Sequence, residues 1–212
     1  MSTAGRKSRL KRGRGTGEEG RVATLQDARL RLRDYQPVEI PFETGMIAAA
    51  VSVLLRDGDD GLETLFIHRA VRVGDRWSGQ IAFPGGRREP TDPDLLTTAI
   101  RETLEEIGVD LSRAERLGVL DDLYPRTPVL PPVVVRPFVF ALTERPAIVE
   151  SLEVQSAFWV SFHSLQAPGA RTSMTVDHPG IPTQVLPAYA VGKHLVWGMS
   201  ERILTPLISL VS

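Results

Sequence analysis

The chain has 212 residues, of which 42% are hydrophobic and 24% are charged, and this composition excludes a disordered chain, a collagen and a long coiled coil. Cysteine is absent, so thiol nucleophiles, thiolate zinc sites and disulfides are excluded together. The longest apolar runs, 46–55 and 133–142, fall short of the roughly 20 residues that a membrane-spanning helix needs. Because the start of the chain also lacks an apolar signal segment, we expect a soluble, cytoplasmic protein without membrane contact.

The net charge of −1 conceals a basic start of the chain. Six Lys and Arg residues stand against two Glu residues within the first twenty positions. A basic, glycine-rich segment with almost no apolar side chains cannot offset its own ordering entropy. Residues 1–22 are therefore predicted to form a disordered tail, and residues 23–212 a single domain. Since no aromatic residues are interleaved with the charges, nucleic acid is not an expected partner beyond contact through this tail.

The first elements of the domain follow from apolar runs and turn residues. Residues 25–34 favour a short helix. Two apolar runs at 46–55 and 62–68 flank a turn rich in Asp and Gly, which predicts a β-hairpin. Residues 80–83 predict a short strand, which Pro84-Gly85-Gly86 ends, and a loop is expected to follow.

The clearest helix is predicted over residues 92–108. Asp92 suits the N-cap, Pro93 the first helical position and Gly108 the C-terminus. Further strands are expected at residues 117–120, 133–142 and 157–162, and a last helix at 200–210 with Ser200 as its cap. Several strands around two helices predict an α+β fold of the layered α/β/α kind, with a mixed β-sheet sandwiched between helices.

Three carboxylates gather on one face of the predicted helix. Glu105 and Glu106 follow Glu102 by three and four residues, so the three carboxylates share that face. Like charges at this spacing repel, and only Arg101 offers a local counter-charge. A hard divalent cation such as Mg²⁺, which takes several oxygen ligands, would compensate for the excess charge. A run of Glu on a helix is otherwise simply its solvated face, and the spacing alone leaves that reading open.

The segment around these residues resembles a known signature. Arg101-Glu102-Thr103-Leu104-Glu105-Glu106-Ile107-Gly108-Val109 resembles the Nudix box, whose core reads Arg-Glu-x-x-Glu-Glu-x-Gly followed by an aliphatic residue. Thr103 stands where the strict box has an aliphatic residue, and Pro93 where it has an upstream Glu. Asp92 instead lies nine residues before Arg101, as in the longer loop of the coenzyme A diphosphatase subgroup. Helix capping, rather than metal binding, is the role we expect for Asp92.

The resemblance to that subgroup extends beyond the box. His68-Arg69, followed by residues 78–86 with their Phe-Pro-Gly-Gly ending, is similar to the subgroup's upstream motif, although its usual His before the Gly pair is absent. Residues 153–160 and 196–199 are similar to its later segments. The similarity covers about residues 45–210 and implies the Nudix arrangement of a mixed sheet between helices.

The Nudix resemblance also implies a reaction, in which water attacks one phosphorus of a nucleoside diphosphate derivative with the help of Mg²⁺, or Mn²⁺ as a substitute. The resemblance assigns the metal to Glu102, Glu105 and Glu106. The proton of the water goes to Glu105, with Glu153 as a rival base, and Arg101 orients a box glutamate. Arg69 is expected to grip substrate phosphate, and Gly85 and Gly86 to form a backbone turn close to the ligand.

The substrate is less closely defined than the reaction. The leading hypothesis, from resemblance alone, is coenzyme A or acyl-CoA, split into 3',5'-ADP and the (acyl-)phosphopantetheine. The box determines the chemistry and the rest of the pocket the substrate, so an NDP-sugar, a dinucleoside polyphosphate or an oxidised nucleotide remains an alternative. A different class is a non-catalytic module that senses a nucleotide. The expected partner is a nucleotide small molecule, and the oligomeric state, monomer or homodimer, stays open.

Overall fold

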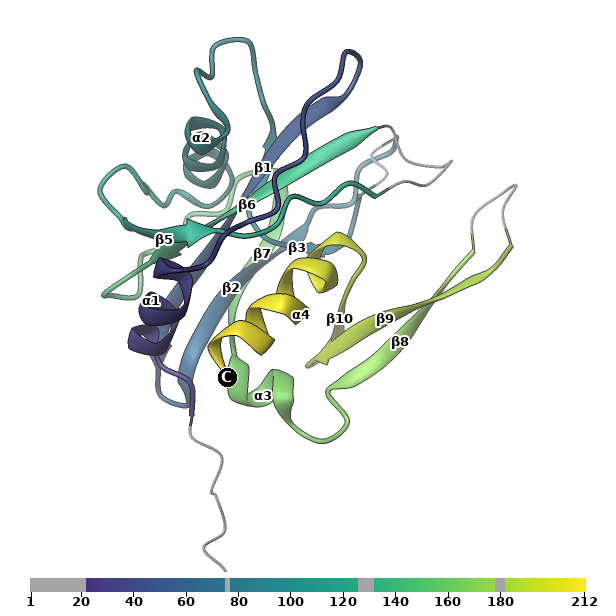
Figure 1. The fold of residues 1–212 in the computed structure, drawn as a ribbon. Helices are drawn as coiled ribbons and strands as arrows, with labels where there is room; N and C mark the ends of the chain where they lie inside the picture. The colour runs from purple at the N-terminus through teal and green to yellow at the C-terminus, as the bar shows by residue number, and fades with distance from the viewer. Residues whose placement is uncertain (1–21, 75–76, 126–131, 178–181) are drawn as a thin grey trace, which may run out of the picture.

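The computed structural model describes residues 22–74, 77–125, 132–177 and 182–212 (Figure 1). The predicted basic tail therefore lies outside the described residues, except for Val22. Within the described part of the chain, no helix is long and apolar enough to cross a bilayer.

A seven-stranded mixed sheet lies at the centre of the molecule (Figure 1). Its main path runs β3-β2-β1-β6-β5, with β4 paired to β1 and β7 paired to β2. The strands are β1 (Ile47–Gly58), β2 (Gly61–Arg69), β3 (Ile81–Ala82), β4 (Gly85–Arg87), β5 (Glu115–Val119), β6 (Val133–Ala141) and β7 (Val154–Ser161). Among the described strands of this sheet, β1 and β6 pair in parallel and the other pairs are antiparallel. The predicted hairpin is confirmed as β1 and β2.

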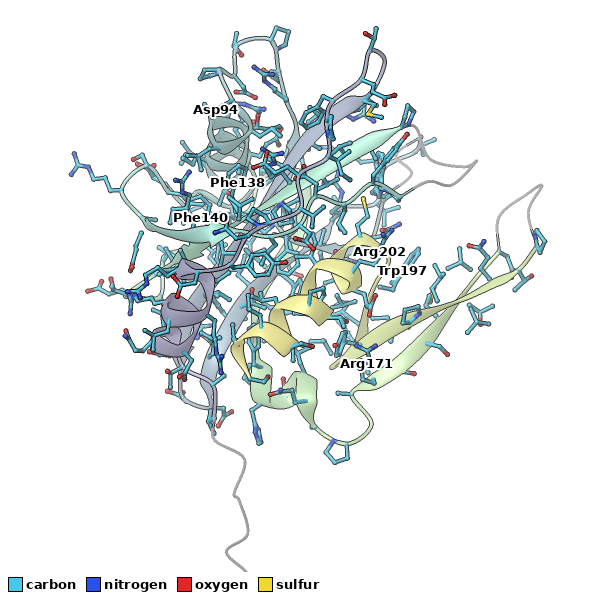
Figure 2. The ribbon with its side chains drawn as sticks, viewed as in Figure 1. Asp94, Phe138, Phe140, Arg171, Trp197 and Arg202 are labelled. Atoms are coloured by element: carbon cyan, nitrogen blue, oxygen red, sulfur yellow. The ribbon has the colours of Figure 1, made fainter. Side chains whose placement is uncertain are left out.

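Helices cover both faces of this sheet (Figure 1). They are α1 (Leu25–Arg33), α2 (Leu95–Ile107), α3 (Phe162–Gln166) and α4 (Met199–Val211). One apolar core lies between the sheet and α1, α3 and α4. A second core lies under α2, where Phe138 and Phe140 of β6 are buried (Figure 2). The predicted α+β fold with a mixed sheet between helices is confirmed.

A smaller antiparallel sheet, in the order β10-β9-β8, was not predicted from the sequence. It comprises β8 (Arg171–Val176), β9 (Gln184–Val191) and β10 (His194–Trp197), and β8 and β9 project away from the central sheet (Figure 1). Most residues of β8 and of the first half of β9 are exposed. Because neither face of these strands is regularly buried, the sequence carries no alternation of apolar and polar residues to indicate them.

The turn predicted at Gly85 and Gly86, and the first residue of the loop predicted after it, are wrong. Gly85–Arg87 forms the strand β4, which pairs with Ala49, Ala50 and Val51 of β1. Gly85 has a φ of +148°, and a Cβ atom there would lie 2.3 Å from the carbonyl oxygen of Ala50. A glycine is therefore required for the chain to approach β1 this closely.

Two predicted helix caps are also wrong, although both helices exist. Asp94 is the N-cap of α2 and accepts a hydrogen bond from the backbone N–H of Thr97 at 2.7 Å, so Asp92 does not cap the helix. Ser200 lies inside α4, where its hydroxyl donates to the carbonyl of Ile81 at 2.9 Å. The predicted end of α2 is confirmed, because Gly108 takes the left-handed conformation that closes a helix.

Candidate active site

The three box glutamates of α2 have very different environments. Glu106 is on the side of the helix that faces the sheet, and its side chain is only 4% exposed. The side chain of Glu102 is 18% exposed, and that of Glu105 is 58% exposed. A solvated face would expose all three carboxylates, so this reading fails for Glu102 and Glu106.

An open cavity of about 360 Å³ lies beside these carboxylates. It brings together most of the site residues predicted from the sequence. Its lining includes Arg69, Gly85, Gly86, Glu102, Glu106 and Glu153. Arg101 and Glu105 do not line it. Residues from β2, β4, α2 and the turn before β7, which are distant in the sequence, thus meet at one concave surface.

Glu106 is the most buried acid of the cavity, and it is held from two sides. The backbone N–H of Gly85 donates to its Oε2 at 2.8 Å, and Arg69 Nη1 lies 3.3 Å from its Oε1. Burial raises the pKa of Glu106 to about 7, although the Gly85 N–H and Arg69 favour the charged form. A cation in the cavity would favour the carboxylate further.

Glu102 lies against the backbone of β4. A Cβ atom on Gly86 would lie 2.5 Å from the carboxyl carbon of Glu102, so a side chain at this position would displace the carboxylate. Burial raises the pKa of Glu102, and the nearby Arg101 opposes this effect. Gly86 therefore leaves the space that the carboxylate occupies.

Arg101 connects the loop before α2 to the box glutamates. Its Nε and Nη2 donate to the two carboxylate oxygens of Asp92 at 3.1 and 2.9 Å. Its Nη1 lies 3.0 Å from an oxygen of Glu102 and 3.0 Å from an oxygen of Glu105. One end of the guanidinium is thus fixed by Asp92, and the other end contacts two carboxylates.

Asp92 is a residue whose place in the site the sequence reasoning missed. It is 3% exposed, and it also accepts hydrogen bonds from the Glu89 N–H and the Thr98 hydroxyl, both at 2.9 Å. The hydrogen bond from Arg101 is the main reason that the pKa of Asp92 is held well below its usual value. The available signal was an acid placed before a Pro in the loop, which equally suits a helix cap.

Glu153, the rival base, lines the cavity and lies just before β7. Its carboxylate lies 2.9 Å from Nη1 of Arg72, and its side chain is 51% exposed. It therefore faces both the cavity and solvent. Glu105 is equally open to solvent but is turned toward Arg101.

The donor chemistry of the cavity suits a hard divalent cation. Carboxylate oxygens are the ligands that Mg²⁺ prefers, and Glu102 and Glu106 both line the cavity. In the described part of the chain, however, no three His, Asp or Glu side chains are grouped as a ligand set. In this structure Arg101 contacts Glu102 and Glu105, and Arg69 contacts Glu106.

The family model for the NUDIX domain matches residues 46–178. This chain belongs to the NUDIX family. The match contains all the predicted site residues of the chain, from Arg69 to Glu153.

Curated relatives of this NUDIX chain include a coenzyme A diphosphatase. An uncharacterized protein of Schizosaccharomyces pombe is 39% identical over 118 residues, which are 53% of this chain and 36% of that protein. The mitochondrial coenzyme A diphosphatase NUDT8 of Mus musculus is 31% identical over 140 residues, which are 66% of each protein. This chain thus spans 36% and 66% of the lengths of these two relatives.

A solved structure supports the fold. The MutT/nudix family protein from Enterococcus faecalis has a TM-score of 0.52 and 20% sequence identity, and the match covers 86% of this chain and 67% of that chain. At this identity the likeness shows the fold alone.

Proposed function

We propose that this NUDIX protein is a metal-dependent hydrolase that cleaves a diphosphate bond in a nucleoside diphosphate derivative. The observation that carries the proposal is the convergence of Glu102, Glu106, Glu153 and Arg69 on one cavity. A non-catalytic nucleotide sensor would need cations to hold phosphate, and it has no use for three acids around the same ligand. The acids are explained if a divalent cation and a proton acceptor are needed there.

In this proposal Glu102 and Glu106 hold Mg²⁺, for which Mn²⁺ can substitute, and Glu105 completes the ligand set by turning from Arg101. The metal would neutralise phosphate oxygens and acidify a water molecule. Arg101 positions Glu102 and Glu105, since it contacts both. Arg69 moves between Glu106 and a substrate phosphate, and the bare backbone of Gly85 and Gly86 lets the diphosphate approach.

The proposed reaction balances without a further reactant. The oxygen of water forms a bond to one phosphorus, and the bridging P–O bond breaks with its electrons on the leaving phosphate. The proton of the water goes to a carboxylate, for which Glu153 and Glu105 are the candidates. Glu153 is the favoured base, because it lines the cavity and Glu105 does not.

The substrate that we propose is coenzyme A or acyl-CoA. The lining of the cavity also includes the apolar residues Val133, Val135, Met199 and Ile203. Such a lining suits a diphosphate that carries a weakly polar chain, as the phosphopantetheine portion of coenzyme A does. The relative NUDT8 of mouse, which carries the name coenzyme A diphosphatase, supports the same choice.

We also propose a cytoplasmic location, which fractionation of the producing cells would test.

Chromatography of the products tests both levels of the proposal. Purified protein with Mg²⁺ is incubated with coenzyme A, ADP-ribose, a UDP-sugar, an oxidised nucleotide and diadenosine polyphosphates, with and without EDTA. We expect 3',5'-ADP from coenzyme A, and a loss of at least about a hundredfold in rate for Glu106→Gln. Glu144→Gln, which removes an exposed acid that does not line the cavity, is the matched control.

The outcomes separate substrate from mechanism. Cleavage of another member of the panel alone would retain the hydrolase and overturn coenzyme A as its substrate. If none of these diphosphates were cleaved while nucleotides still bound, the sensing module would replace the hydrolase.

A further inference from the structure

A second arginine of the cavity stands apart from the carboxylates. Neighbouring residues of a strand point to opposite faces. In β4 the Cβ direction of Gly86 leads to the carboxylate of Glu102, so the side chain of Arg87 leaves on the other face. There its guanidinium carbon lies 5.7 Å from the ring centroid of Trp77, and both residues line the cavity. The backbone of β4 thus separates Arg87 from the proposed metal ligands.

Among the described residues, no acid forms an ion pair that would neutralise the charge of Arg87. Arg69, the other arginine among the described lining residues, forms an ion pair with Glu106. No ion pair of Arg87 with a carboxylate occurs in the described part of the chain. A guanidinium at a concave surface presents a planar fork of N–H donors, which matches the oxygens of a phosphate group.

Arg87 is also held in place before any ligand arrives. Its backbone pairs with Ala49 of β1, and its carbonyl accepts a hydrogen bond from Arg101 Nη2 at 3.1 Å. The ring of Trp77 attracts the guanidinium through a cation–π contact and limits its motion. A cation ordered in this way loses less conformational entropy when it binds an anion.

We propose that Arg87, supported by Trp77, forms a second anion subsite that receives a phosphate monoester carried by the ribose of the substrate. This inference rests on the proposed function, because the reacting diphosphate is assigned to Arg69 and to the metal ligands Glu102 and Glu106. The ligand class is therefore a nucleotide that carries a phosphate monoester in addition to its diphosphate. Coenzyme A, with its 3'-phosphate, belongs to this class, whereas ADP-ribose and the NDP-sugars do not.

Calorimetric titration with 3',5'-ADP and with 5'-AMP, without added metal, tests the subsite by binding alone. The wild-type protein should bind 3',5'-ADP at least about tenfold more tightly than 5'-AMP, since one charge-assisted contact is gained. Arg87→Gln should remove this preference, and Arg87→Lys should retain part of it. Arg116→Gln is the control, because it removes the same charge from an exposed position on β5 and should leave the preference intact.

Substitutions of Trp77 test whether its aromatic ring, rather than its size alone, supports the guanidinium of Arg87. Trp77→Phe keeps an aromatic face for the guanidinium and should keep most of the preference for 3',5'-ADP, whereas Trp77→Leu should lower it severalfold. Equal loss in both variants would overturn the supporting role of Trp77. Thermal unfolding of each variant shows that the comparison is made on folded protein.

The failure of the subsite is distinguishable from the failure of the proposed function. Equal affinity of the wild-type protein for both nucleotides, or an unchanged preference in Arg87→Gln, would overturn the subsite even if coenzyme A were hydrolysed. If an Arg87-dependent preference for 3',5'-ADP were found without hydrolysis of any diphosphate, the anion subsite would be supported and the proposed hydrolase activity would be contradicted.

Discussion

Two buried Arg–Asp pairs in this molecule have nearly the same geometry and different surroundings. Arg101 contacts both oxygens of Asp92 at 3.1 and 2.9 Å, and Arg136 contacts both oxygens of Asp122 at 2.8 Å. The remaining nitrogen of Arg101 reaches Glu102 and Glu105 beside the cavity. Arg136 instead contacts the exposed Glu39.

The second pair anchors the segment that leads from α1 to β1. Asp122 accepts a hydrogen bond from the backbone N–H of Ile40 at 2.8 Å. Its neighbour Asp121 accepts from the N–H of Val38 and from the hydroxyl of Tyr35, both at 2.8 Å. The comparison teaches that a bidentate pair by itself indicates only local order. The groups that the pair holds decide whether it serves catalysis or the attachment of a chain segment.

The largest expected effect follows from Arg101→Gln. This change leaves Asp92 buried without its counter-charge and also frees Glu102 and Glu105. We expect a loss of about 3 kcal/mol in the free energy of unfolding, together with a fall in kcat of at least about a hundredfold. Chemical denaturation and steady-state kinetics measure the two effects. An unchanged kcat would show that the box glutamates need no positioning by Arg101.

Arg136→Gln is the matched change at the anchor. It should lower the free energy of unfolding by a similar amount, about 3 kcal/mol, because Asp122 is left buried and uncompensated. The kcat of the folded protein should change less than about twofold, because no group held by Arg136 lines the cavity. A large fall in kcat at a temperature where the variant is folded would remove the distinction between the two pairs.

Gly86→Ala tests the space beside Glu102. The new Cβ would meet the far end of a flexible side chain, so the free energy of unfolding should fall by only about 1 kcal/mol while the carboxylate is displaced. We expect kcat to fall about tenfold. Gly118→Ala, whose Cβ would lie 3.4 Å from the Leu32 carbonyl oxygen, is the control and should retain kcat. Equal kinetics for both variants would contradict the proposed place of Glu102.

A further effect concerns the pH dependence of stability at the anchor. Burial and the hydrogen bond to Asp121 raise the pKa of Tyr35 to about 12 from its ordinary value of 10.0. A group whose pKa is raised in the folded state stabilises the fold fully below its unfolded pKa and loses that contribution as pH rises through the folded pKa. Stability should therefore decline between about pH 10 and pH 12 by more in the wild-type protein than in Tyr35→Phe. Parallel declines in thermal unfolding would contradict this account.

The sequence predicted the helix α2, the hairpin of β1 and β2 and the box carboxylates, because each depends on local spacing or on a contiguous signature. It could not predict that Asp92 faces inward to Arg101, since a polar residue before a helix suits a cap equally well. The positions of Trp77 and Arg87 in the cavity were missed for a different reason. Arg87 lies on β4, whose pairing with β1 requires the close approach of Gly85 to Ala50, and Trp77 reaches the cavity from a turn before β3.

The outcome for the glutamates also depends on tertiary structure. Their helical spacing correctly placed them along α2, but it did not distinguish a buried carboxylate from an exposed one. Packing of α2 on the sheet buries Glu106 and leaves Glu105 exposed. Helical periodicity predicts the face of the helix on which a side chain lies, but it does not predict how closely the sheet packs against that face.

In the proposed site, Glu106 helps to hold a divalent cation in the cavity. Titration of the protein with Mn²⁺, followed by electron paramagnetic resonance of the free ion, tests it directly. We predict that the wild-type protein and Glu144→Gln bind Mn²⁺ alike, and that Glu106→Gln binds it at least about tenfold more weakly. Equal affinity of Glu106→Gln and the wild-type protein would contradict the claim.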